Sequence, residues 1–108
     1  MSSDIHEVKA FVHRNRIADV VDALYREGYR DLTVIDVQGL LKALDTREQR
    51  YSVEIGQKVI TEVKLELVCE GAERTAKAIE LIRAHARTGQ AHAGWIYVTG
   101  LIERTEIV

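Results

Sequence analysis

The chain has 108 residues, of which 46% are hydrophobic and 30% are charged, so we expect one packed domain covering residues 1–108. The formal net charge is −2 with both signs mixed along the chain, which argues against a nucleic-acid partner because such binders normally carry a basic stripe. The single cysteine excludes an internal disulfide framework. A single cysteine and the absence of a long apolar run together favour a cytoplasmic protein.

A short repeat suggests how the chain is organised. The segment EVKAFV at 7–12 recurs as EVKLELV at 62–68, and each copy is followed by a helical pattern, a glycine and another apolar strand. We therefore predict two β-α-β units joined by a middle segment, with chance similarity between two strands as the alternative.

The first helix is predicted over residues 16–27. Its apolar residues fall on one helical face: Ile17, Val20, Val21, Leu24 and Tyr25. Asn15 is a candidate N-cap, because its side-chain oxygen can accept a backbone N–H. Gly28 suits the left-handed position that ends a helix.

The remaining strands and the second helix are predicted from residue patterns: an alternation of two for a strand and one apolar face for a helix. Strands are predicted in DLTVIDV (31–37), KVITEVKLELVC (58–69) and GWIYVTGLI (94–102). The middle strand alternates, and its inward residues are Val59, Thr61, Val63, Leu65, Leu67 and Cys69. A second helix is predicted over 72–87 and ends at Gly89, and its inner face is Ala76, Ile79, Ile82 and Ala86.

The order β-α-β-β-α-β predicts an α+β, ferredoxin-like fold, in which both helices cover one face of an antiparallel sheet. On the other face, Lys64 and Glu66 lie beside Ile60 and Val68. This mixed character favours burial against another subunit over full solvation.

Two segments lie between these elements. Residues 40–57 are too long for a tight hairpin, carry at least six charges, and are expected to be mobile in the free protein and to dock a partner, with simple solvation as the alternative. The segment ARTGQAHAGW at 86–95 has two glycines and little side-chain bulk. That composition lets backbone approach another group closely.

Three stretches resemble PII signal-transduction proteins: AFVHRNRIADVVDALYREGYRDLTVIDVQG, EVKLELV and TGQAHAGWIYV. The resemblance covers nearly the whole chain, and residues 40–57 correspond to the partner-docking T-loop of that family. It implies a homotrimer that binds adenine nucleotides in clefts between subunits. It also implies a regulator that reports metabolic state to a membrane transporter or a metabolic enzyme.

The resemblance also implies site residues. Thr33 and Gly39 stand where the family has its adenine-pocket threonine and glycine. Thr88, Gly89 and Gly94 match the loop that wraps phosphates, whose bare backbone can present successive N–H groups to an anion.

Departures from the family pattern bear on the ligand. His92 replaces a glycine, Ala93 an aspartate and Trp95 a phosphate-binding lysine, while Ala43 replaces a glutamine that helps bind magnesium and 2-oxoglutarate. The family has two phosphate-binding arginines near this end of the chain. Glu106 stands at the position of one, and the position of the other falls after Val108. Because Thr33 and Gly39 match the family, the adenosine pocket is expected to be kept. Because the phosphate-binding residues differ, AMP or ADP rather than ATP is expected as the ligand.

Some residues have two interpretations. Trp95 could stack on a ligand or begin a strand at a subunit interface, and His92 could contact a phosphate or a metal or be an exposed loop residue. Cys69 fits a small core residue, and no catalytic set of residues appears, so an enzyme is not expected. The alternative function is a divalent-metal-binding trimer of the cation-tolerance type, although the four histidines lack close ligand spacing.

Overall fold

The computed structural model describes residues 4–36 and 62–108. The elements are β1 (Ile5–His13), a 3-10 turn (Arg14–Arg16), α1 (Ile17–Arg26), β2 (Leu32–Ile35), β3 (Glu62–Glu70), α5 (Ala72–His85) and β4 (Gly94–Gly100). The predictions for residues 40–57, for Gly39, Ala43, Val59 and Ile60, and for Thr61 lie outside the described residues.

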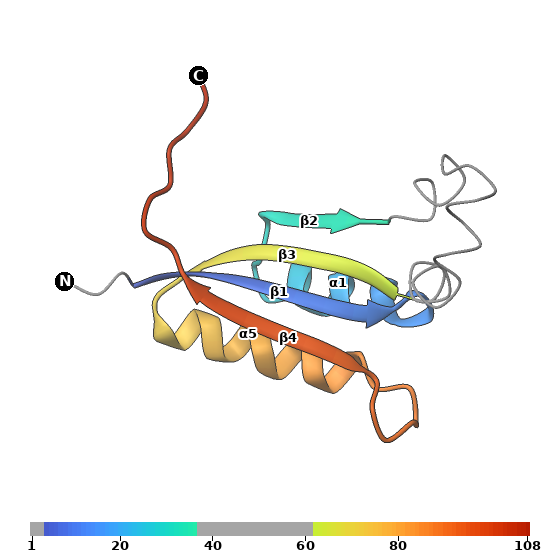
Figure 1. The fold of residues 1–108 in the computed structure, drawn as a ribbon. Helices are drawn as coiled ribbons and strands as arrows, with labels where there is room; N and C mark the ends of the chain where they lie inside the picture. Colours follow the sequence, from blue (N-terminus) through green and yellow to red (C-terminus); the bar gives the residue numbers. More distant parts are fainter. Residues whose placement is uncertain (1–3, 37–61) are drawn as a thin grey trace, which may run out of the picture.

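The four strands form one sheet in the order β2-β3-β1-β4, with every neighbouring pair antiparallel. Both helices lie on the same face of this sheet (Figure 1). The ferredoxin-like prediction is therefore confirmed. The repeated segments are β1 and β3, which pair side by side at the centre of the sheet, with Val8 opposite Leu67 and Ala10 opposite Leu65.

The core lies between the sheet and the helices. Alternate residues of the two central strands point toward the helices and are buried: Val8, Ala10, Val12, Val63, Leu65, Leu67 and Cys69. This confirms the predicted inward face of β3 over its described part. Helix α1 adds Val20 and Leu24, and α5 adds Ala78 and Ile82.

The start of the first helix differs from the prediction. Asn15 is not its N-cap, because the chain first makes the 3-10 turn, where the Asn15 backbone N–H donates to Nδ1 of His13 at 3.1 Å. Helix α1 then starts after Arg16 without a side-chain cap. Its end is as predicted: Gly28 has φ +90°, and the N–H groups of Gly28 and Tyr29 donate to the carbonyls of Tyr25 and Leu24.

The predicted inner face of the second helix was wrong in part. Ile82 is buried, but Ala76 is exposed and Ile79 only half-buried, while Thr75 and Ala78 are buried. Apolar periodicity missed Thr75 because its hydroxyl can be buried only with a partner, and it donates to the Gly71 carbonyl at 2.9 Å. The helix ends at His85, before the predicted end, so Gly89 with φ +85° belongs to the following loop.

The sheet face opposite the helices carries Lys64, Glu66 and Val68, all half-buried, as predicted. In the part of the chain that the structure describes, neither helix is long and apolar enough to span a bilayer.

Candidate functional site

Gly94 begins β4 directly against β1. A Cβ atom at this position would lie 2.1 Å from the backbone oxygen of Phe11. Real Cβ atoms do not come this close, so β1 and β4 can pair here only around a glycine. The group that the backbone of Gly94 approaches closely is thus the chain's own neighbouring strand, and this glycine fixes where the 86–93 loop enters the sheet.

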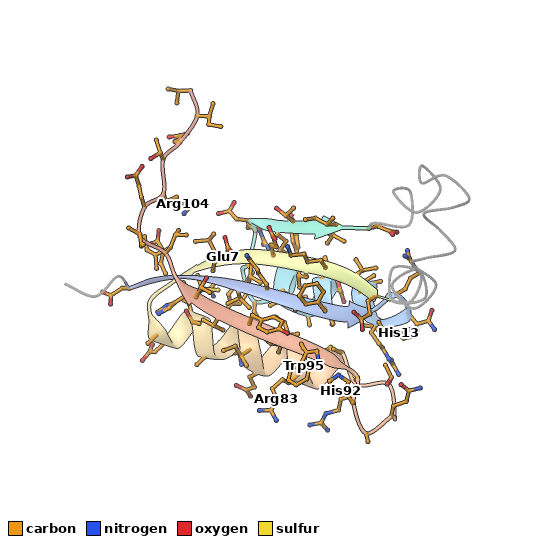
Figure 2. All side chains as sticks on the ribbon, in the orientation of Figure 1. Glu7, His13, Arg83, His92, Trp95 and Arg104 are labelled. Carbon is orange, nitrogen blue, oxygen red and sulfur yellow. The ribbon has the colours of Figure 1, made fainter. Side chains whose placement is uncertain are left out.

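The loop before Gly94 places three other predicted residues at the same end of the sheet. The Thr88 hydroxyl accepts a hydrogen bond from the Gln90 N–H at 3.4 Å, and Gly89 has nothing near its Cα on the side where a Cβ would point. The His92 ring lies 4.8 Å from that of Trp95, tilted by 59° (Figure 2). Both side chains are exposed, Trp95 to 56%.

Trp95 begins an aromatic row on the open sheet face. Its ring stacks on Tyr97 with centroids 6.5 Å apart, and Tyr97 meets Phe11 edge-on at 5.9 Å. Lys64 lies 5.9 Å from the centre of the Phe11 ring. Exposed aromatic rows of this kind are typical of surfaces that meet a partner or a flat ligand.

Thr33 lies at the opposite edge of the sheet. It is exposed on β2, opposite Glu66 of β3, and points to the open face. Strands β3 and β1 separate β2 from β4. Since neighbouring strands are about 4.8 Å apart, Thr33 is at least roughly 14 Å from Trp95. The structure therefore brings Thr88, Gly89, His92, Gly94 and Trp95 together and keeps Thr33 apart from them.

Two ion pairs lie on the open face. Lys64 Nζ lies 2.8 Å from a Glu66 carboxylate oxygen, and this hydrogen bond lowers the pKa of Glu66 below its ordinary value. Lys9 and Glu7 form a second pair at 2.9 Å, which raises the pKa of Lys9. A lowered pKa keeps the Glu66 carboxylate ionised, which does not suit a general acid at neutral pH.

Cys69 is buried on the helix-facing side of β3, and burial raises the pKa of its thiol. A thiol that stays protonated is a poor nucleophile. The residue therefore belongs to the core, as its place in the alternating pattern indicated.

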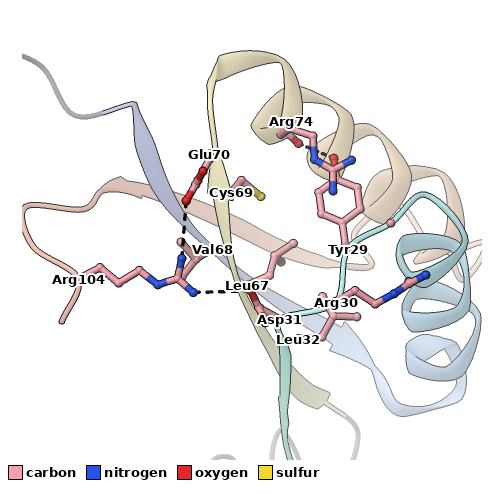
Figure 3. A pocket seen from close by; sticks show the side chains of 11 residues that line it. Tyr29, Arg30, Asp31, Leu32, Leu67, Val68, Cys69, Glu70, Arg74 and Arg104 are labelled. Carbon is pink, nitrogen blue, oxygen red and sulfur yellow. Dashed lines mark hydrogen bonds and ion pairs between the residues drawn. The ribbon is translucent and has the colours of Figure 1, made fainter. Parts of the chain in front are cut away.

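Two cavities flank the sheet. One of about 350 Å³ lies at the start of β2, where Arg74 stacks 3.7 Å above the Tyr29 ring (Figure 3). In it Arg104 lies 3.6 Å from Asp31 and 3.8 Å from Glu70, so this arginine has two carboxylates beside it. The other, of about 340 Å³, lies under the 86–93 loop and includes Arg83 and Arg87. Sequence reasoning missed these two arginines, although both fall within the helix predicted over 72–87; in the structure Arg83 lies in the last turn of α5 and Arg87 in the loop that follows it.

The histidines do not converge. His6 lies 3.2 Å from the Thr75 hydroxyl, His13 accepts from the backbone of Asn15, and His92 contacts Trp95. Within residues 4–36 and 62–108, no three His, Cys, Asp or Glu side chains come together as metal ligands would. The geometry gives no support to the metal-binding alternative.

The chain is similar to known proteins over nearly its whole length. The family model described as "Nitrogen regulatory protein P-II" matches residues 5–107. "Nitrogen regulatory protein P-II 1" of Methanothermobacter thermautotrophicus is 31% identical over 103 residues, covering 95% of this chain and 89% of that protein. "Nitrogen regulatory protein P-II" of Azospirillum brasilense is 28% identical over 101 residues, covering 94% and 89%.

A solved structure shares the fold. The crystal structure of Arabidopsis thaliana PII bound to citrate superposes with a TM-score of 0.65 at 29% identity, covering 92% of this chain and 78% of that one. The similarity extends over both β-α-β units, which agrees with the sheet order and the helix placement described above.

Proposed function

This chain belongs to the nitrogen regulatory protein P-II family and is a PII-like signal-transduction regulator, and we propose that it senses an adenine nucleotide between subunits of a homotrimer. We further propose that it acts without catalysis, by changing what a partner protein can bind. Regulators of this kind work because a ligand stabilises one of two conformations that a partner distinguishes.

The proposal that the site lies between subunits rests on one observation. Thr33 and the 86–95 loop lie at opposite edges of one sheet, with β3 and β1 between them. If both contribute to one ligand site, the two halves must come from different copies of the chain. The mixed open face of the sheet supports this assembly, because aromatic residues and paired charges there can pack against the same face of another copy.

The ligand that we propose is AMP or ADP rather than ATP. Trp95 stands where the family has a phosphate-binding lysine, and Glu106 where it has an arginine. Each hydrogen bond to a charged group typically contributes about 1.5–3 kcal/mol, so losing these contacts removes several kcal/mol from ATP binding. The same departures, with Ala43 in place of the glutamine, argue against 2-oxoglutarate.

We also propose that residues 40–57 dock the partner, a membrane transporter or a metabolic enzyme. The support is their charge and their match in sequence to the T-loop of the family. Deleting residues 44–53 should abolish partner binding and leave the trimer mass unchanged, whereas a deletion that dissociates the trimer would assign the segment to assembly instead.

Calorimetric titration with AMP, ADP and ATP, each with and without 2-oxoglutarate, tests the ligand. We expect AMP or ADP to bind at least as tightly as ATP, with no effect of 2-oxoglutarate. Binding of ATP at low micromolar affinity that 2-oxoglutarate strengthens would contradict the proposal. A parallel titration with Zn²⁺ and Cu²⁺ should show no tight stoichiometric binding, which the metal-binding alternative requires.

A further inference from the structure

The cavity under the 86–93 loop is walled by apolar side chains. The C-terminal half of α5, the beginning of β4 and the end of β1 enclose about 340 Å³. Its apolar lining residues, apart from Gly94, are Phe11, Val12, Ile82, Ala86, Ala91, Ala93, Trp95 and Ile96. Trp95, exposed to 56%, offers the largest flat surface at its edge.

Positive charge in the lining of this cavity comes from Arg83 and Arg87, and His92 also lines it. Figure 2 labels Arg83, His92 and Trp95 at this end of the sheet. No aspartate or glutamate is among the described residues that line it. Glu80 lies near both arginines on the outer surface of α5, but within the described residues no ion pair joins it to either. The two arginines thus line this cavity without a described carboxylate in its lining.

The two arginines come from adjoining parts of the chain. Arg83 lies in the last turn of α5, which is a favourable place for a cation, and Arg87 lies in the loop two residues after the helix ends at His85. An anion bound in this cavity could accept charge-assisted hydrogen bonds from both guanidinium groups. By comparison, the cavity at the start of β2 is lined by Arg30, Arg74 and Arg104, and there two carboxylates, Asp31 and Glu70, lie close to Arg104 (Figure 3).

We propose that Arg83 and Arg87 bind the phosphate of the nucleotide, while its apolar part packs against the Trp95 side of the cavity. This inference rests on the proposed function, which it deepens by naming an anion subsite. The subsite is built from the end of α5 and the loop that follows it, whereas the lysine position that Trp95 occupies lies on β4. A single phosphate fits two guanidinium groups, and so the subsite favours a nucleoside monophosphate over longer phosphate chains.

The single tryptophan makes the cavity observable. Trp95 lines it and is the only tryptophan in the chain, so its emission reports directly on occupancy. We would titrate the full chain with AMP, adenosine and pyrophosphate while recording Trp95 fluorescence. We expect AMP to change the emission and to bind at least tenfold more tightly than adenosine, with the difference shrinking as ionic strength rises.

The double variant R83Q/R87Q should lower AMP affinity at least tenfold, to the level of adenosine. The matched control is Lys77→Gln, which removes a positive charge from the exposed surface of the same helix away from the cavity and should leave AMP affinity unchanged. Circular dichroism of each variant shows whether α5 is intact.

The outcomes separate this inference from the proposed function. If calorimetry shows AMP binding that R83Q/R87Q leaves within twofold of the wild type, the subsite is overturned and the nucleotide sensor stands. If AMP does not bind but pyrophosphate does, and R83Q/R87Q abolishes that, the subsite stands and the adenine ligand falls. If neither AMP nor pyrophosphate alters Trp95 emission in the wild type, the subsite is overturned.

Discussion

Gly94 shows how one residue positions the loop of the candidate site. The resemblance to a phosphate-wrapping loop suggested that this glycine lets a ligand approach. In the structure the close neighbour is the Phe11 carbonyl of β1, 2.1 Å from where a Cβ would be. The glycine therefore serves strand pairing first, and any effect on ligand binding follows from where the pairing holds the loop.

Gly94→Ala should destabilise the protein by about 1–3 kcal/mol, because overpacking forces β1 and β4 apart. Urea unfolding of the two proteins measures this difference. Gly100→Ala is the matched control at the other end of β4, where nothing lies within 4 Å of an added Cβ, and it should change stability by less than about 0.5 kcal/mol. Equal effects of the two changes would refute the pairing role.

Tyr29 joins the two helices at the end of α1. Its hydroxyl donates to the Arg74 carbonyl at 2.6 Å, and the Arg74 side chain covers its ring and donates to the Glu27 carbonyl at 3.0 Å. Burial raises the pKa of the Tyr29 hydroxyl above its ordinary value near 10. The folded state therefore favours the neutral phenol.

Tyr29→Phe should cost about 0.5–1.5 kcal/mol at neutral pH, the usual net contribution of one hydrogen bond. Because the folded pKa is raised, the contribution is complete below about pH 10 and is lost as pH rises through the folded pKa. Urea unfolding at pH 7 and at pH 10–11 should show wild type and variant converging at high pH. A constant difference across this range would be inconsistent with the buried phenol.

At the scale of elements, period-two alternation predicted the sheet better than apolar periodicity predicted the helices. The inward residues of β3 were correct because each strand residue has only two faces to choose from. On α5 the prediction selected Ala76 and Ile79, which lie beside the buried Thr75 and Ala78. Small residues give a weak apolar signal, and the satisfied hydroxyl of Thr75 could not be foreseen from the sequence.

Two isoleucines of α5 test the corrected face. Ile82→Ala should destabilise the domain by about 2–5 kcal/mol, because Ile82 is 1% exposed and its loss leaves a cavity in the core. Ile79→Ala makes the same chemical change at a half-buried position next to a surface groove and should cost less than half as much. Thermal unfolding of both variants compares them, and equal losses would restore the face predicted from the sequence.

At the scale of the whole molecule, the sequence predicted the fold, and its loop-side site residues remain a prediction. It did not reveal Arg83 and Arg87, because their cavity exists only where the end of α5 packs beside the loop and β4. It also could not show that Thr33 lies across the sheet from Trp95, since strand order decides that distance. Both observations depend on long-range pairing rather than on local pattern.

The proposed site between subunits requires a trimer. Sedimentation equilibrium should give about three times the chain mass of 12.2 kDa. A stable monomer at micromolar concentration would leave Thr33 and the 86–95 loop in separate surfaces and remove the proposed cleft.

Mixed trimers test the central claim most directly. Thr33→Tyr blocks the β2 side of the cleft, and His92→Glu places a negative charge on the loop side, so each variant alone should bind no AMP. In a mixed trimer one cleft combines the intact loop of one subunit with the intact Thr33 of the next. Calorimetry on mixed trimers purified through two different tags should therefore give one AMP per trimer. Mixed trimers that bind no AMP, from a wild type that binds three, would show that each site lies within a single chain and would contradict the account.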